Sequence, residues 1–403
     1  MFRSPEGIAA SAPLPAARHI GIVLADFSSG GTERVALRLA QVWAGAGRRV
    51  TLYCGDEEGP SRDLVGPGIE VRPAMPRESR PLSRGALGRL LAQMVAGSPP
   101  DAIFCPGNHH VPILSAIRAS LGRRCPPIVA KISNPIARPH RSWLSQRLFV
   151  ASYRWRTAGF ERLVAMSPAL ATEAARALGR RAIPALAEPT LDDDAALPPP
   201  RAPGSLILAI GRLTPQKNLA LALETLALTR RDRRLLILGE GDDYGALADR
   251  AAALGLGDRV RFAGYVADVR PYLAIADVLL CSSRYEGYPA ALIEALAARV
   301  PVVSTNCSPA LPEIIVDPSF GAIVPADPRA LAEALEAVID ECRRPDEALL
   351  APLLQRHRAE ASGLAWLALL DEAVAARSHA ESPRPELATI AGLVPAVRPA
   401  PAG

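Results

Sequence analysis

Two carboxylates lie eight positions apart around a Gly-Tyr-Pro turn in residues 282–299. Glu286 precedes the turn, and Glu294 lies in the run of Ala, Leu and Ile that follows Pro289. Proline is accepted in the first turn of a helix, and the residues after it favour helix. A loop carboxylate and a helix carboxylate can face one cleft and hold two ends of one polar ligand. The alternative is an acidic residue that favours the helix dipole, beside a solvated glutamate.

A glycine and two cations form a second cluster at residues 211–218, directly after the apolar run Ser205–Ile210. The length and flanks of that run predict a buried strand, and the residues after the cluster predict a helix. Gly211 lets the backbone approach a phosphate closely, while Arg212 offers a planar fork and Lys217 a mobile point charge. This pair suits a diphosphate better than a carboxylate. The alternative is a solvated basic turn, but two such motifs, each after a predicted strand, favour a ligand site.

Together the two motifs resemble the nucleotide-sugar domain of retaining glycosyltransferases of the GT-B fold, family 4. The resemblance covers roughly residues 18–375. It rests on Gly211-Arg212-Leu213 with Lys217-Asn218, the E-x7-E pattern of Glu286 and Glu294, Leu235–Gly241, Val260–Tyr265, Pro301–Thr305 and the Gly30-Gly31-Thr32-Glu33-Arg34-Val35 loop. It implies an α/β protein in which two doubly wound parallel sheets, both Rossmann-like, face an interdomain cleft.

The resemblance also assigns roles to residues. It implies that Arg212 and Lys217 bind the donor diphosphate, that Glu294 binds the ribose hydroxyls and that Glu286 binds the donor sugar. Glu286, Arg212 and Lys217 are therefore the expected catalytic residues. The two cations would do what a divalent metal does in other transferase folds, so we expect no metal and no cofactor. The remaining expected donor contacts are Gly30, Gly31, Gly211, Tyr265 near the base, Gly287, Tyr288 and Pro289.

One departure from the family pattern lies in the N-terminal half. Many members carry a histidine in the loop after a central strand, where it touches the donor sugar. Here the strand predicted at Ile128–Ile132 runs into Ser133 and Asn134, without a histidine. Asn134 offers an amide instead, and Asn108 and His109, which follow the preceding strand, are further possible contacts to the acceptor or the sugar. The alternative for His109 is a solvated or hydrogen-bonding role.

Strands alternate with helices through both halves of the 403-residue chain, which predicts parallel, doubly wound sheets. We expect an irregular segment at Gly59–Ser83 and a terminal helix at Gly363–Ala376. The expected organisation is a disordered extension (1–17), an N-terminal acceptor-binding Rossmann-like domain (18–187), a Pro-rich linker (188–204), a C-terminal nucleotide-sugar-binding Rossmann-like domain (205–362), a crossover helix (363–381) and a disordered tail (382–403).

Composition points to a reduced, cytoplasmic protein. No apolar run reaches the 18 or so residues that span a bilayer, and residues 1–17 contain no apolar core of a signal peptide. The 6 cysteines are scattered without a C-x-x-C pair, so packed thiols are expected rather than disulfides or a metal site.

Charge is unevenly distributed along the chain. Residues 1–200 carry 25 basic and 16 acidic residues, whereas residues 201–403 carry 21 and 25. The basic excess gathers at 118–162, where tryptophan and leucine alternate with arginine at spacings that suit an interfacial helix on an anionic membrane. The alternative is a surface helix with a packed aromatic face. No nucleic-acid motif accompanies the charge, and we expect no nucleic acid partner.

The sequence thus predicts a retaining, metal-independent glycosyltransferase at the cytoplasmic face of the inner membrane. It would move a hexosyl or N-acetylhexosaminyl group from a nucleotide-sugar, for which UDP is expected over GDP, to a polyprenyl-diphosphate-linked glycan in surface polysaccharide synthesis. One alternative is a non-catalytic scaffold that binds sugar nucleotide. Another is a different GT-B enzyme, such as a sugar-nucleotide epimerase or a phosphorylase. A nicotinamide-dependent oxidoreductase is disfavoured because no G-x-G-x-x-G follows a strand.

Overall fold

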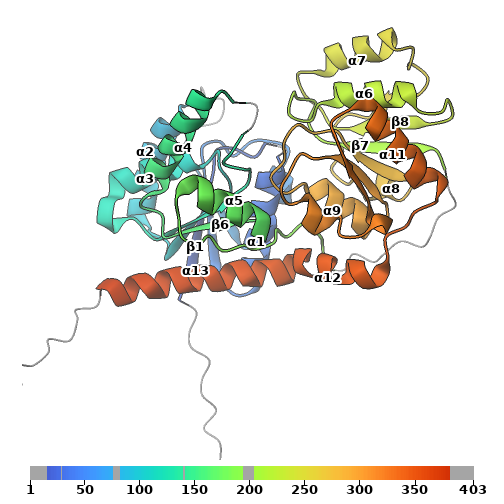
Figure 1. Ribbon diagram of the computed structural model, residues 1–403. Helices are drawn as coiled ribbons and strands as arrows, with labels where there is room; N and C mark the ends of the chain where they lie inside the picture. The colour runs from blue at the N-terminus through green and yellow to red at the C-terminus, as the bar shows by residue number, and fades with distance from the viewer. Residues whose placement is uncertain (1–15, 29, 76–81, 139–140, 194–203, 382–403) are drawn as a thin grey trace, which may run out of the picture.

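The computed structural model describes residues 16–28, 30–75, 82–138, 141–193 and 204–381, which form two units (Figure 1). Each unit is built on a six-stranded sheet whose paired strands all run parallel. The strand order is β3-β2-β1-β4-β5-β6 in the N-terminal unit and, read from the other edge, β9-β8-β7-β10-β11-β12 in the C-terminal unit. Both orders are that of the doubly wound Rossmann fold, so the predicted fold class is confirmed.

The strands of the N-terminal unit are β1 (His19–Leu24), β2 (Arg49–Cys54), β3 (Ile69–Pro73), β4 (Ala102–Cys105), β5 (Ile128–Ile132) and β6 (Arg162–Ala165). Its helices are α1 (Gly31–Gly45), α2 (Arg84–Gly97), α3 (Val111–Leu121), α4 (Trp143–Thr157) and α5 (Pro168–Leu178). Helix α1 packs on one face of the sheet, and α2, α3 and α5 pack on the other.

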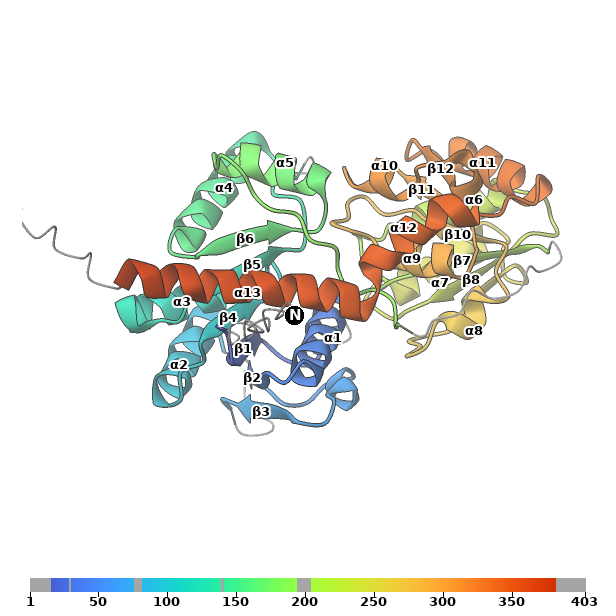
Figure 2. The ribbon, with the colours of Figure 1, turned by 90° about the horizontal axis from the view of Figure 1, so that it is seen from below.

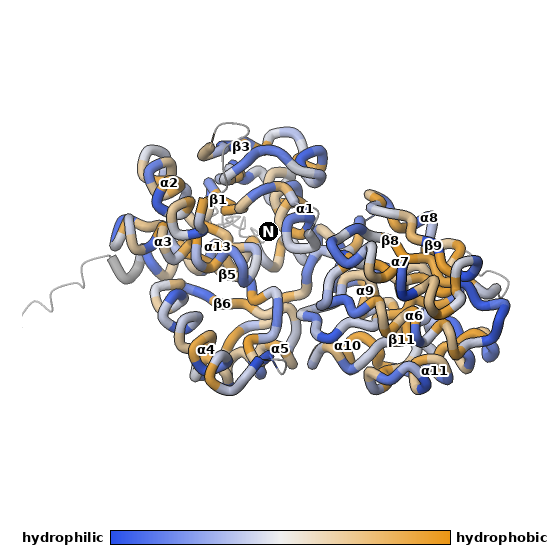
Figure 3. The backbone as a smooth tube through the Cα atoms, turned by 90° about the horizontal axis from the view of Figure 1, so that it is seen from above, coloured by the Kyte–Doolittle hydropathy of each residue, from blue (hydrophilic) through white to orange (hydrophobic). Residues whose placement is uncertain are grey.

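The strands of the C-terminal unit are β7 (Leu206–Ile210), β8 (Arg234–Leu238), β9 (Val260–Phe262), β10 (Val278–Cys281), β11 (Val302–Thr305) and β12 (Gly321–Val324). Its helices are α6 (Leu219–Leu228), α7 (Tyr244–Ala253), α8 (Arg270–Leu273), α9 (Ala290–Ala297), α10 (Leu311–Ile314), α11 (Pro328–Asp340) and α12 (Glu347–His357). Orange stretches of hydrophobic backbone lie among these strands in Figure 3, as expected of parallel strands covered on both faces.

Helix α13 (Ala359–Glu381) leaves the C-terminal unit and lies along the N-terminal unit (Figure 2). It completes the core there, because Trp366 packs edge-on against Phe104 with ring centroids 5.3 Å apart. Trp43 of α1 donates a hydrogen bond of 2.9 Å to the Gly363 carbonyl. The helix begins at Ala359 rather than at the predicted Gly363, and the short bridge between Leu191 and Arg358 joins the two segments that pass between the units.

The structure differs from the sequence-based expectation in the segment Gly59–Ser83 and at Ala17. The segment Gly59–Ser83 is not irregular throughout, because Ile69–Pro73 forms the edge strand β3, which pairs with β2. Its alternation of apolar and charged residues is only five residues long and lies between glycines and prolines, which hid the signal. Ala17, assigned to the N-terminal extension, is buried. The remaining extension, the tail and most of the linker lie outside the described residues.

Within the described residues, no helix combines the length and the hydropathy that crossing a membrane requires.

Candidate active site

A cleft of about 290 Å³ lies between the two units. It is lined by loops that follow the carboxyl ends of β1, β5, β7 and β10, where open α/β sheets bind ligands. Among the predicted site residues, those that line it are Gly30, Gly31, Asn134, Gly211, Arg212, Lys217, Glu286, Gly287, Tyr288, Pro289 and Glu294. The sheet topology thus brings the glycine loop of one unit to the cations and carboxylates of the other.

Lys217 and Glu286 form an ion pair in this cleft. Lys217 Nζ lies 2.7 Å from Glu286 Oε1, and the Ser283 hydroxyl donates to the same oxygen at 2.7 Å. The Glu286 backbone is fixed as well, because its N–H donates to the Cys307 carbonyl at 2.8 Å. Burial alone would lower the pKa of Lys217, but the Glu286 carboxylate outweighs it and raises that pKa. The ammonium group is therefore charged when the cleft is free of ligand.

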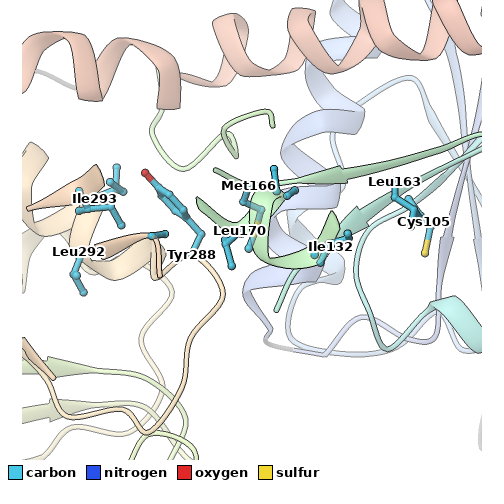
Figure 4. Packing of buried hydrophobic residues seen from close by; sticks show 14 of the residues in the cluster. Cys105, Ile132, Leu163, Met166, Leu170, Tyr288, Leu292 and Ile293 are labelled. Atoms are coloured by element: carbon cyan, nitrogen blue, oxygen red, sulfur yellow. The ribbon is translucent and has the colours of Figure 1, made fainter. Parts of the chain in front are cut away.

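Glu286 is held at the end of a strand, in a loop that packs closely on the opposite unit. A Cβ atom added to Gly287 would lie 2.0 Å from the Ser133 carbonyl oxygen, so only glycine fits at this contact. Tyr288 lies across from Met166 and Leu170 of the N-terminal unit, with its ring directed back toward the C-terminal unit, and these residues belong to one hydrophobic cluster that spans both units (Figure 4). The close approach fixes the position of Glu286 relative to the N-terminal unit.

Glu294 lies on α9, with Pro289 as the helix N-cap rather than in its first turn. Burial raises the pKa of the Glu294 carboxyl, and Arg34 and Arg38 of α1 oppose that shift. A second cavity of about 520 Å³ adjoins the cleft and shares Arg34, Arg38 and Glu294 with it. Glu294 therefore faces cations that belong to the other unit, and a hydroxyl-bearing ligand at this point would contact both units.

Arg212 is exposed on the turn after β7 and lines the cleft near Lys217. The turn is fixed to the neighbouring loop after β10, because the Ser282 hydroxyl donates to the Lys217 carbonyl at 3.0 Å. Gln216 adds a side-chain hydrogen bond of 3.0 Å to the Tyr285 carbonyl. One anchored turn therefore presents two cations to the cleft, one paired with Glu286 and one open to solvent.

Asn108 and His109 do not line the cleft. Asn108 instead holds the loop that does: its Oδ1 accepts from the Ser133 N–H at 2.8 Å, and its Nδ2 donates to the Asn134 carbonyl at 3.0 Å. His109 Nε2 lies 3.0 Å from Glu33 Oε1. The sequence indicated Asn108, His109 and Asn134 as possible contacts of the acceptor or the sugar. In the structure only Asn134 of these three lines the cleft, and Asn108 and His109 lie behind the residues that do.

Tyr265 also lies outside the residues that line the cleft. Its backbone N–H donates to Glu240 Oε1 at 3.1 Å, which gives a role to a glutamate that the sequence left unassigned. Tyr288 lines the cleft, but its hydroxyl lies 2.9 Å from His357 Nε2. Burial raises the pKa of Tyr288, so its phenol stays neutral.

Sequence reasoning missed a buried ion pair at the margin of the cleft. Lys131, in the middle of β5, is fully buried and contacts the carboxylate of Glu188, which lines the cleft. His357 Nδ1 lies 3.0 Å from the Glu188 carbonyl oxygen. The sequence did contain one signal of this pair, a single lysine inside the apolar strand Ile-Val-Ala-Lys-Ile. Because charged residues are rarely buried without a partner, this lysine indicates an acidic partner elsewhere in the chain.

The family comparisons agree with this geometry. Residues 30–187 match the model described as glycosyl transferase 4-like domain, and residues 204–341 match the one described as glycosyl transferases group 1. The two matches together take in both units of the fold. The chain therefore belongs to the GT4-type glycosyltransferase family of the GT-B fold.

Individual relatives share shorter stretches. The N-acetylgalactosamine-N,N'-diacetylbacillosaminyl-diphospho-undecaprenol 4-alpha-N-acetylgalactosaminyltransferase of Campylobacter jejuni is 31% identical over 136 residues, which are 34% of this chain and 37% of that protein. The lipopolysaccharide core glycosyltransferase LpsE of Rhizobium meliloti is 36% identical over 101 residues, 25% of this chain and 29% of that protein. The chain thus spans only about a third of the length of these curated relatives.

Solved structures extend the likeness over nearly the whole fold. Anabaena HepE in complex with UDP and glucose has a TM-score of 0.66 and 18% identity, and the alignment covers 90% of this chain and all of that one. WaaG, a glycosyltransferase involved in lipopolysaccharide biosynthesis, has a TM-score of 0.63 at 18% identity, with 88% and 98% covered. At such identities the likeness shows the fold alone.

Proposed function

We propose that this enzyme is a retaining glycosyltransferase that moves a sugar from a UDP-sugar to a polyprenyl-diphosphate-linked glycan during surface polysaccharide synthesis. The observation that carries the proposal is the ion pair of Lys217 and Glu286 in the interdomain cleft, with Arg212 beside it. A diphosphate has the charge to draw Lys217 away from Glu286, which frees the carboxylate to accept hydrogen bonds from sugar hydroxyls.

Transfer breaks the bond between the anomeric carbon and the nucleotide phosphate. Negative charge grows on the leaving diphosphate, where Arg212 and Lys217 stabilise it without a metal ion. Positive charge grows on the sugar ring, and the Glu286 carboxylate, freed from Lys217, stabilises it. The acceptor hydroxyl attacks on the face of the leaving group and gives its proton to the departing diphosphate, so the anomeric configuration is retained. Positioning by the two units supplies much of the remaining acceleration.

The nature of the acceptor is proposed from the relatives and from helix α4. The Campylobacter relative is named for an acceptor on diphospho-undecaprenol, a membrane lipid. In this chain, α4 exposes Trp143 to 70% and Trp155 to 75%, with Leu144 and Leu148 also exposed. Arginines flank them, and the Arg147 guanidinium lies 5.0 Å from the Trp143 ring centroid. Exposed tryptophans beside arginines suit the interface of an anionic membrane, and we propose peripheral contact with the inner face of the cell membrane there.

A panel of UDP- and GDP-sugars tests the donor assignment. In the presence of EDTA, wild type is expected to bind one UDP-sugar and hydrolyse it slowly, because the two cations replace a metal at the diphosphate. Glu286→Ala is expected to weaken binding and to lower hydrolysis by about a hundredfold. Isothermal titration calorimetry and UDP release measure the two effects, and Glu333→Ala, on α11 outside the cleft, is the matched control. Folded wild type that binds no sugar nucleotide would contradict the donor assignment.

Sedimentation with anionic vesicles tests the membrane assignment. The double variant Trp143→Ala/Trp155→Ala is expected to reduce the bound fraction at least about tenfold, because it removes most of the apolar surface that enters the interface. The control variant Ile275→Ala/Leu349→Ala also removes two exposed apolar side chains, Ile275 from the turn after α8 and Leu349 from α12. This variant should bind the vesicles as wild type does. Equal binding of the tryptophan variant and wild type would rule out α4 as the contact.

A further inference from the structure

One carboxylate and two imidazoles gather beside the Gly30-Gly31 loop. A carboxylate oxygen of Glu33 and one ring nitrogen from each of His109 and His110 all lie within 4.8 Å of one another. Glu33 lies in the first turn of α1, after β1, and the two histidines lie in the loop after β4. Strands β1 and β4 are neighbours in the sheet, which is why residues so distant in sequence meet. The cluster lies outside the residues that line the donor cleft.

His110 makes this cluster more than a chance group of polar residues. Its side chain is fully buried, and neither ring nitrogen has a hydrogen-bond partner among the described residues. Leaving a buried polar group unpaired is costly, so such groups in native proteins call for an explanation. Its ring centroid lies 3.9 Å from that of His109, whose Nε2 contacts Glu33 at 3.0 Å. The orphaned nitrogens therefore border two groups that are themselves good metal ligands.

We propose that Glu33, His109 and His110 form a binding site for one divalent transition-metal ion of the zinc class. Two imidazole nitrogens and one carboxylate oxygen suit zinc and its neighbours rather than magnesium or calcium, which prefer oxygen ligands. Ligand atoms on a tetrahedral zinc ion lie roughly 3.4 Å apart, which small side-chain rotations within the 4.8 Å cluster achieve. His109 is 38% exposed, so a water molecule can complete the shell from that side.

Burial also holds the ligand side chains in place, because His110 is fully buried. Glu33 is only 3% exposed, and its carboxylate packs so closely on Gly30 that a Cβ atom there would lie 2.0 Å from Glu33 Oε2. The ligands are therefore held before the ion arrives.

The ion would be structural and would tie the Gly30-Gly31 loop to the loop that carries His109 and His110. On one side Glu33 packs against Gly30, which lines the cleft. On the other, Asn108, next to His109, holds the Ser133–Asn134 loop by hydrogen bonds. The site is separate from Arg212 and Lys217, so it adds no metal to the proposed chemistry at the diphosphate. It goes beyond the proposed function and does not depend on it.

Metal titration of the full chain tests the site. Protein stripped with chelator is expected to bind one equivalent of Zn²⁺ by calorimetry, and Co²⁺ should give the visible absorption of a low-coordinate site. His110→Ala is expected to weaken zinc binding at least about a hundredfold, more than loss of an outer-shell partner costs. Glu33→Gln, which keeps the shape of the side chain, should weaken it at least about tenfold. His19→Ala, at the opposite end of β1, removes one histidine elsewhere and should bind as wild type does.

Two results would overturn the site: no binding by wild type at about 100 μM free Zn²⁺, or equal binding by wild type and both ligand variants. If His110→Ala does not fold, Glu33→Gln decides the question. Glu286→Ala separates this proposal from the donor proposal, because it should lose UDP-sugar binding and keep the full equivalent of zinc.

Discussion

Lys217→Ala is expected to lower kcat by at least about a hundredfold, corresponding to roughly 3 kcal/mol of lost transition-state stabilisation. Lys217 Nζ lies 2.7 Å from Glu286 Oε1 in the free cleft, and in the proposed mechanism it moves to the leaving diphosphate. Its removal takes one of two cations from the developing charge. It also leaves Glu286, only 8% exposed, without its counter-ion and close to the phosphates of the donor.

Steady-state transfer or donor hydrolysis at saturating donor measures this effect. Arg261→Ala is the matched control, because Arg261 is an exposed cation on β9 outside the donor cleft, and it should keep wild-type kcat. Lys217→Arg keeps the charge but changes its geometry, so an intermediate rate is expected. A kcat within threefold of wild type for Lys217→Ala would contradict the assignment of the leaving-group charge to this side chain.

The second large effect is expected on stability. Lys131→Met should lower the free energy of unfolding of the N-terminal unit by about 3–5 kcal/mol, because it leaves Glu188 buried without its cation. Lys131 is fully buried and Glu188 is 5% exposed, so water cannot replace the lost partner at either position. Removing both charges should cost far less, and Lys131→Met/Glu188→Leu is therefore expected to recover most of the loss.

Urea denaturation followed by tryptophan fluorescence measures this effect in the relevant unit. All 4 tryptophans report on it, because they lie on α1, α4 and α13: Trp43, Trp143, Trp155 and Trp366. The C-terminal unit contains no tryptophan, so its unfolding does not contribute to the fluorescence change. A single variant that loses less than about 1 kcal/mol, or a double variant as unstable as the single one, would show that the pair is not the stabilising feature.

Much of the fold could be predicted from the sequence because parallel strands buried on both faces are short apolar runs. Ile128–Ile132 was predicted with the bounds that the structure shows, and the place of Glu286 in a loop with Glu294 on the following helix was predicted as well. Strand β3, with its Ile-Glu-Val-Arg-Pro sequence, was not predicted, because it is not a continuous apolar run. An edge strand is only half covered and carries charges.

The site was harder to predict than the fold, since it depends on contacts between distant segments. Motif spacing brought Lys217 and Glu286 to one cleft but could not show that they bind each other there. His109 follows a strand that ends at the cleft, yet its ring turns to Glu33, 76 positions earlier in the chain. Likewise, nothing local to Glu188 reveals Lys131 as its partner, because β5 and the segment after α5 meet only in the folded protein.

The two passages between the units have a mechanical consequence. The chain leaves the N-terminal unit through the segment around Leu191 and returns through Arg358 at the start of α13, and the bridge between these residues bonds the two passages side by side. Two bodies tethered at such a bridge move most easily by rotation about it, and this rotation has to separate Gly287 and Tyr288 from the N-terminal unit. We therefore expect the cleft to open and close by a hinge rotation about the bridge, with α13 moving together with the N-terminal unit.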